Sequence, residues 1–293
     1  MSISTKILNS QSLASVAEIE RIEFCFCGID CFDSYIEKAF TASANAEAWK
    51  KDKASFLFRK VRSQDTIAIE IYKEGLKVAD VIDNTYGSYY ASFPNQLLYV
   101  GFIADWTSIA NSFGHGYYQI KAQKVILGQS QTFSSRNYFV IPYSEKGANE
   151  TVRIETYTDG NILSSDLNYQ SLIEGGWYQS MRISGRFGNV SEVLNQDKVL
   201  NADRQVVSVQ DSIEREYTLF VNYLPESAKK QLTNDMSLTT RTIITDYNLL
   251  NDEVIRQKPV YLESFDEVRH AGRGTAYNLK YKDRFNNTIL RTY

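Results

Sequence analysis

The chain has 293 residues and a formal net charge of −3, and it contains no run of Lys and Arg of the kind that marks a nucleic-acid-binding protein. Its 20 Tyr and 15 Phe contrast with only 3 Met and 4 Pro, a bias that favours half-buried β-strands. No apolar run approaches the roughly 20 residues that span a bilayer. The first 20 residues lack the basic region and apolar stretch of a secretory signal. We therefore expect a mostly-β protein, without nucleic acid specificity or a membrane span, that is made and assembled in the cytosol.

The three cysteines lie close together, at Cys25, Cys27 and Cys31. Strand alternation puts Cys25 and Cys27 on one face, with Phe24 and Phe26 on the other. Zinc sites normally take four Cys or His ligands, and this spacing is not a recurring zinc pattern. A reduced, buried structural role is the main prediction, because free cysteine behaves as a small hydrophobe. Zinc binding remains the minor alternative.

Strand patterns dominate the first half of the chain. Ile67, Ile69 and Ile71 alternate with other residues, so one face of that strand is expected to be buried. Polar turns on both sides of this strand favour a three-stranded meander. The predicted strands are Glu23–Cys27, Ser55–Arg62, Thr66–Tyr72, Leu76–Ile82, Tyr117–Leu127 and Tyr138–Tyr143.

A short helix is predicted over Asp105–Phe113. Asp105 is a suitable N-cap, Trp106 begins an apolar stripe, and Gly114 supplies the stop. The following Gly116-Tyr-Tyr-Gln-Ile120 is typical of the entry to the penultimate strand of an immunoglobulin-like sandwich. The tyrosine hydroxyl of such a strand often bonds back to the backbone.

The polar segment Tyr143–Glu150 is the predicted domain boundary. The predicted domains are residues 1–145, with 1–20 as a candidate extended arm, and residues 146–293. We expect two β-sandwich-like or barrel-like domains with one short helix each, the second helix over Pro225–Asp235 with Ala228, Leu232 and Met236 at helical spacing. The strands predicted in the second half are Thr151–Tyr157, Tyr178–Ile183, Gln205–Val209, Glu216–Tyr223, Thr242–Thr245, Pro259–Leu262 and Thr275–Tyr281.

Few residues are candidates for catalysis. The only histidines, His115 and His270, are expected in exposed loops, and the sequence contains no nucleophile elbow, phosphate-binding loop or zinc-protease motif. The segment Asp246–Asp252 offers oxygen ligands but lacks the glycine and closing glutamate of a calcium loop. A turn in which Asp and Asn side chains bond the local backbone is the better interpretation. We expect no enzyme activity, no cofactor and no metal.

Several stretches resemble structural proteins encoded in the tail modules of tailed bacteriophages, near the distal-tail and baseplate components. They are Tyr99–Trp106, Gly116–Ile120, Trp177–Asn189, Glu216–Leu219 and Ile244–Asn248. The resemblance covers most of the chain from about Phe56 onward. It implies a cofactor-free virion protein, a ring- or hub-forming subunit of a tail, baseplate or neck. Such a subunit would contact copies of itself and other tail proteins through Tyr-rich sheets and loops.

Two other functions are weighed against this one. The first is a carbohydrate- or receptor-binding β-sandwich module, and the second, ranked last, is a hydrolase with two carboxylates across a cleft. Candidate interface or ligand-contact residues are Trp106, Trp177, Tyr178 and Arg273. The sequence also gives a reason to doubt two of them, because they look like core anchors at the start of a helix or strand.

Overall fold

The computed structural model describes residues 20–21, 36–59, 66–93, 99–126, 129–158, 177–200, 206–221, 224, 228, 231–236, 239, 241–251, 254–270, 274–283 and 287–290. The predicted strand Glu23–Cys27, the three cysteines and the candidate contact residue Arg273 lie outside these residues.

The first half of the chain forms two sheets. In one sheet the strand order is β1-β3-β7-β6, and in the other it is β2-β10-β8-β4-β5, with β9 also paired to β8. The pair β2–β10 is parallel and the other pairs are antiparallel. The strands are β1 (Glu20–Arg21), β2 (Ile36–Thr41), β3 (Lys53–Arg59), β4 (Ala68–Lys73), β5 (Leu76–Val81), β6 (Gly87–Tyr90), β7 (Tyr99–Asp105), β8 (Gly116–Ile126), β9 (Gln129–Ser134) and β10 (Asn137–Pro142).

These two sheets pack face to face as a β-sandwich. Phe56 and Phe102 come from the first sheet, Ile71 and Tyr138 come from the second, and all four belong to one buried cluster. The rings of Phe56 and Tyr138 meet edge-to-face across the interface, with centroids 6.3 Å apart. The predicted alternation of Ile67, Ile69 and Ile71 is confirmed, because all three side chains are buried.

Helix α2 (Trp106–Phe113) closes one end of the sandwich and matches the prediction. The Asp105 carboxylate accepts hydrogen bonds from the backbone N–H groups of Thr107 (2.9 Å) and Ser108 (3.4 Å). Gly114 ends the helix with φ +79°, a conformation that glycine adopts without strain. The expected tie of a strand-entry tyrosine is also present, because the Tyr118 hydroxyl donates to the Gly114 carbonyl.

The second half of the chain forms a closed β-barrel. Its strands follow the order β12-β11-β14-β15-β16-β13, and β13 pairs back with β12 to complete the ring. Its core contains the inward residues of these strands together with Leu224, Ala228, Leu232 and Met236. The strands are β11 (Thr151–Thr158), β12 (Trp177–Leu200), β13 (Val206–Val221), β14 (Arg241–Asp246), β15 (Lys258–His270), β16 (Gly274–Asp283) and β17 (Asn287–Leu290).

The apolar stripe expected for the second helix is confirmed, because Ala228, Leu232 and Met236 are all buried. Of the predicted Pro225–Asp235 helix, the described residues show a helical Ala228 and a π-helical turn over Gln231–Met236.

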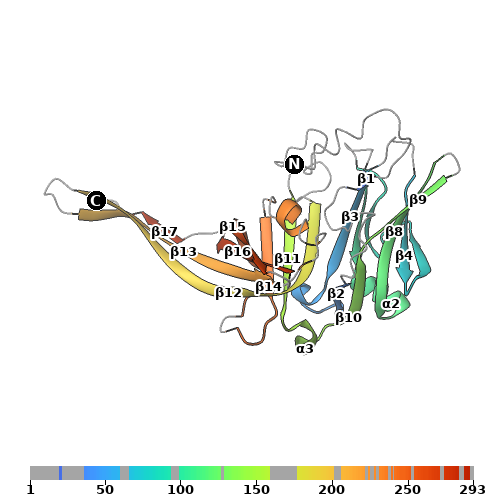
Figure 1. Ribbon diagram of the computed structural model, residues 1–293, viewed down its shortest axis with the longest axis horizontal. Coiled ribbons are helices and arrows are strands. Elements are labelled where there is room, and N and C mark those ends of the chain that lie inside the picture. Colours follow the sequence, from blue (N-terminus) through green and yellow to red (C-terminus); the bar gives the residue numbers. More distant parts are fainter. Residues whose placement is uncertain are drawn as a thin grey trace.

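The largest difference from the predicted elements is a long two-stranded arm. The expected strands Gln205–Val209 and Glu216–Tyr223 are parts of one continuous strand, β13, and β12 extends far beyond the predicted Ile183 to Leu200. Beyond the barrel, β12 and β13 continue together as an antiparallel hairpin, with β17 added along β13. This hairpin projects away from the sandwich (Figure 1). We call the paired residues Ser191–Leu200 and Val206–Glu216 the arm.

Two other expectations need correction. The predicted three-stranded meander is wrong: β4 and β5 form a hairpin, but β3 pairs with β7 in the other sheet. His270 ends strand β15 instead of lying in a loop. Strands β1, β2, β6, β7, β9 and β17 were not predicted from the sequence. The fold class is confirmed as mostly β with several sheets, comprising one sandwich and one barrel.

The strand pairing changes at the short helix α3 (Glu145–Ala148), which lies inside the predicted boundary segment. The two halves are in close contact. Ser55, Leu57 and Tyr99 lie on the face of the first sheet that points away from the sandwich core, and they are buried as well. Strand β12 packs against β3 on this face. The division into domains of residues 1–145 and 146–293 remains a prediction.

Candidate functional site: a buried charged seam between the two halves

The structure corrects the expected contact residues. Trp106 is 1% exposed in the sandwich core, where its ring centroid lies 4.7 Å from that of Tyr138. Trp177, at the start of β12, is 0% exposed and packs against Phe93. Tyr178 is buried and its hydroxyl donates to Glu155 at 3.0 Å. These three rings therefore offer no open face to a sugar. Trp106 at the start of α2 and Trp177 at the start of β12 are core residues, which agrees with the sequence-based reason to doubt two of the candidates.

The concentration of charge that the sequence analysis missed lies where the barrel meets the sandwich. Three carboxylates and three guanidinium groups are gathered there, and five of the six side chains are almost fully buried. Half of these groups come from each side of α3. We call this set the seam cluster: Glu37, Asp52, Arg136, Arg153, Glu155 and Arg182.

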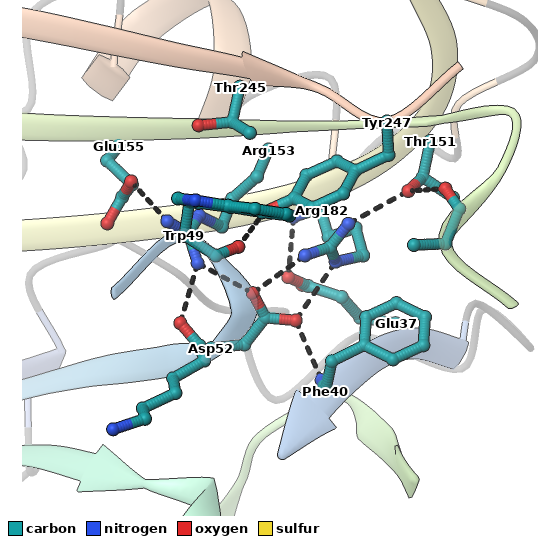
Figure 2. A network of polar contacts seen from close by, with 12 residues as sticks. Glu37, Phe40, Trp49, Asp52, Thr151, Arg153, Glu155, Arg182, Thr245 and Tyr247 are labelled. Atoms are coloured by element: carbon teal, nitrogen blue, oxygen red, sulfur yellow. Dashed lines mark hydrogen bonds and ion pairs between the residues drawn. The ribbon is translucent and has the colours of Figure 1, made fainter. Parts of the chain in front are cut away.

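Asp52 is the centre of the seam cluster. It directly precedes β3, and its Oδ2 accepts the backbone N–H of Phe40 at 2.7 Å. Arg182 on β12 donates two hydrogen bonds to the same carboxylate, from Nε to Oδ2 at 2.9 Å and from Nη2 to Oδ1 at 2.8 Å (Figure 2). Arg153 on β11 adds a third contact, Nη1 to Oδ1 at 3.1 Å. One sandwich carboxylate thus holds two barrel strands.

Arg153 extends this connection along the barrel wall. Its Nη1 also donates to the carbonyl of Lys51 at 2.6 Å, and its Nη2 bonds Glu155 at 2.7 Å. Arg153 and Glu155 alternate along β11 with Val152 and Ile154, which point into the barrel core. The polar face of β11 therefore lies against the sandwich, with its charges compensated by neighbours.

Glu37 forms a second link through β2. Its Oε1 accepts the backbone N–H of Arg182 at 2.8 Å, and its Oε2 accepts Arg136 Nη1 at 3.1 Å. Arg136 then reaches the barrel, where its Nη2 donates to Gln231 at 2.5 Å. Through this chain of contacts Glu37 connects the sandwich to both β12 and the helical segment of the barrel.

Aromatic rings enclose the Arg182 guanidinium. Its central carbon lies 4.6 Å from the ring centroid of Phe40 and 4.1 Å from that of Tyr247, on opposite sides in Figure 2. Such cation–π contacts gain strength when they are withdrawn from water. The Tyr247 hydroxyl donates to the Trp49 carbonyl, which adds a further bond between barrel and sandwich.

Burial and charge shift the pKa values of the two sandwich carboxyls in opposite directions. Burial raises the pKa of Glu37 to about 7, even though Arg136 favours the ionised form. Burial acts in the same direction on Asp52, but the charges of Arg182 and Arg153 outweigh it and hold the pKa of Asp52 below its usual value. Asp52 thus remains ionised at neutral pH, whereas Glu37 titrates near pH 7.

The seam cluster is suited to holding the halves together, because its charged groups are already engaged with one another. Arginine stays protonated and does not serve as a general base. His115 lies outside the seam cluster, exposed as expected, with Nε2 2.9 Å from the Thr41 hydroxyl. The expected turn at Asp246 is confirmed, since its carboxylate accepts the backbone N–H of Asn248 at 3.0 Å.

No protein-family model matches this sequence, and comparison with curated proteins finds no related sequence. Within the described residues, no helix is long and apolar enough to cross a membrane. In the same part of the chain, no three His, Cys, Asp or Glu side chains are grouped as a metal site.

The raised pKa of Glu37 predicts a pH-dependent stability. The folded state holds a proton on Glu37 up to about pH 7, whereas the unfolded state releases it near pH 4.5. The free energy of unfolding should therefore fall as pH rises from about 4.5 to 7, by about 3 kcal/mol, and stay reduced above that. Glu37→Gln keeps a hydrogen-bond acceptor for Arg182 and should remove this dependence.

Urea unfolding at pH 5, 6, 7 and 8 tests this prediction. As pH rises, the unfolding free energy of the parent should fall while that of the variant does not, so the variant should become more stable relative to the parent. The shifted titration of Asp52 lies at lower pH and does not enter this window. A difference that stays constant from pH 5 to 8 would contradict the raised pKa.

Proposed function

We propose that this chain is a non-enzymatic structural subunit that assembles with copies of itself, as a ring- or hub-forming component of a phage tail, baseplate or neck. It would be made in the host cytoplasm and reside in the virion, with other tail proteins as neighbours. The single observation that carries the proposal is the arm, which extends away from the sandwich and contributes none of its described side chains to either buried core.

The composition of the arm supports this proposal. Leu194 is 57% exposed, and it lies directly opposite Ile213, which is 47% exposed, on the paired strands. Val206 near the tip is 66% exposed. Large apolar side chains at these positions keep about half or more of their surface exposed in the isolated chain, and a neighbouring subunit would bury that remaining surface.

The chemistry of the seam cluster supports a structural function over a catalytic one. Displaced pKa values are typical of active sites, but ion pairs that join structural elements displace them as well. In the seam cluster the carboxyls with displaced pKa values, Glu37 and Asp52, are held by arginines that are buried with them. These contacts account for the burial of both groups without a substrate.

A carbohydrate- or receptor-binding module is the second candidate, and one pair of rings favours it. Tyr117 and Phe139 stack on neighbouring strands of the outer sandwich sheet, with centroids 4.6 Å apart, and Tyr117 is 44% exposed. An exposed aromatic on a sheet face can pack against a sugar ring. This pair replaces Trp106, Trp177 and Tyr178, which are buried, as the place where such a ligand would bind.

Light scattering across a concentration series tests the assembly proposal. We expect a discrete oligomer, such as a trimer or hexamer, whose population rises with concentration, and we expect closed particles of the same stoichiometry by negative-stain microscopy. A strict monomer at every concentration would contradict the proposal and favour the glycan-binding candidate.

A further inference from the structure

The two edges of the arm differ. Strand β17 covers the outer edge of β13, where Gln210–Ile213 pair with Asn287–Leu290. The outer edge of β12 is covered near the barrel, where the side-chain amides of Asn248 and Asn251 donate to the carbonyls of Gly185 and Phe187, each at 3.0 Å. Beyond Gly188, no described residue pairs with this edge. An edge of this kind is a template for another strand.

This edge of β12 is regular over the length of the arm. A bulge on β12 separates Gly188 from Ser191, and from there to Leu200 successive β12 residues pair without an extra residue on this strand. At about 3.3 Å per residue this stretch spans roughly 30 Å. The exposed side chains Glu192, Leu194, Gln196 and Lys198 alternate along it and so share one face.

The charges on this face are self-complementary. Two copies of the stretch can pair antiparallel about a two-fold axis that is perpendicular to the sheet and passes midway between the two Asn195 residues. Residues whose numbers sum to 390 are then opposite each other, so Glu192 of each copy faces Lys198 of the other. Leu194 faces Gln196 in the same register. No other register of this kind places these opposite charges face to face.

We propose that the β12 edge of the arm pairs with the same edge of a second copy of this chain, in the antiparallel register centred on Asn195. The inference rests on the proposed self-assembly and identifies one of its interfaces. The contact is isologous, because the same surface is used on both copies, so it joins subunits in pairs. It is therefore separate from the head-to-tail contacts that would close a ring.

A charge-swap experiment tests this register. Lys198→Glu places two glutamates opposite each other at both ends of the contact, and Glu192→Lys does the same with two lysines. Each variant alone should weaken the pairing about tenfold, measured as the dissociation constant by sedimentation velocity in low salt. An equimolar mixture should recover the parent affinity, because each Glu then faces a Lys.

Glu47→Lys is the matched control. Glu47 is exposed and forms a surface ion pair with Lys50 at 2.7 Å, just as Glu192 pairs with Arg215 at 2.9 Å, but it belongs to the sandwich and not to the arm. The control should self-associate like the parent chain.

The outcomes separate this inference from the proposed function. Recovery in the mixture supports the register. The arm pairing is overturned if the parent oligomerises and both arm variants keep its dissociation constant. It is also overturned if the mixture associates as weakly as each variant alone. In both cases the proposed assembly function stands. A parent that is monomeric at every concentration overturns both.

Discussion

Replacing Asp52 with asparagine is expected to lower the free energy of unfolding by about 3–5 kcal/mol, because breaking a buried ion pair leaves its partners uncompensated. Arg182 and Arg153 both bond this carboxylate, and their side chains are only 2% and 1% exposed. An asparagine amide removes the charge. It also turns an N–H₂ group toward one of the guanidinium groups, which donate hydrogen bonds themselves.

Urea unfolding at pH 7 measures this effect, with Asp80→Asn as the matched control. Asp80 is 54% exposed and forms a surface pair with Lys77 at 2.7 Å, so its loss should cost no more than about 1 kcal/mol. If Asp52→Asn changed stability as little as the control, the seam cluster would not join the two halves. If it left the barrel unfolding separately from the sandwich, two transitions would replace one.

The parts of this fold that follow local rules could be predicted from the sequence. The α2 helix has its N-cap at Asp105 and its stop at Gly114, and both signals depend only on neighbouring residues. The alternating isoleucines of β4 likewise reveal their buried face. The expectation of sandwich-like or barrel-like halves rests on the same kind of strand and turn pattern.

The seam cluster could not be predicted in the same way. Its contacts join residues far apart in the chain, such as Asp52 with Arg182 and Glu37 with Arg136. The alternation of Val152, Arg153, Ile154 and Glu155 indicates one apolar and one polar face, and a polar face is normally interpreted as solvent-exposed. Here the polar face lies against the sandwich, and no local signal distinguishes these two cases.

The arm escaped prediction for a related reason. Its β12 sequence, from Ser191 to Leu200, mixes apolar, charged and amide residues, and none of its described side chains belongs to the barrel core. Yet the arm is continuous with the seam cluster through a single strand. Arg182, near the start of β12, is fixed to Asp52, and the same strand continues to Leu200. The seam cluster therefore attaches the strand that carries the arm to the sandwich.

Trp177→Ala is expected to be as disruptive as the loss of Asp52, at about 3–5 kcal/mol of unfolding free energy. Trp177 is fully buried between barrel and sandwich, with its ring edge-to-face with Phe93 at 6.1 Å. A Cβ at Gly101 would lie 2.7 Å from the tryptophan ring, so β7 needs a glycine there for the ring to fit.

Urea unfolding of the Trp177→Ala variant, compared with that of Tyr117→Ala, separates a packing role from a ligand-binding role for Trp177. Tyr117 is a half-exposed aromatic on the outer sheet, so its truncation should cost much less. The two substitutions would cost the same if Trp177 were a surface contact residue, as the sequence first indicated. A large difference means that its ring belongs to the interface that orients the barrel, and with it the arm, on the sandwich.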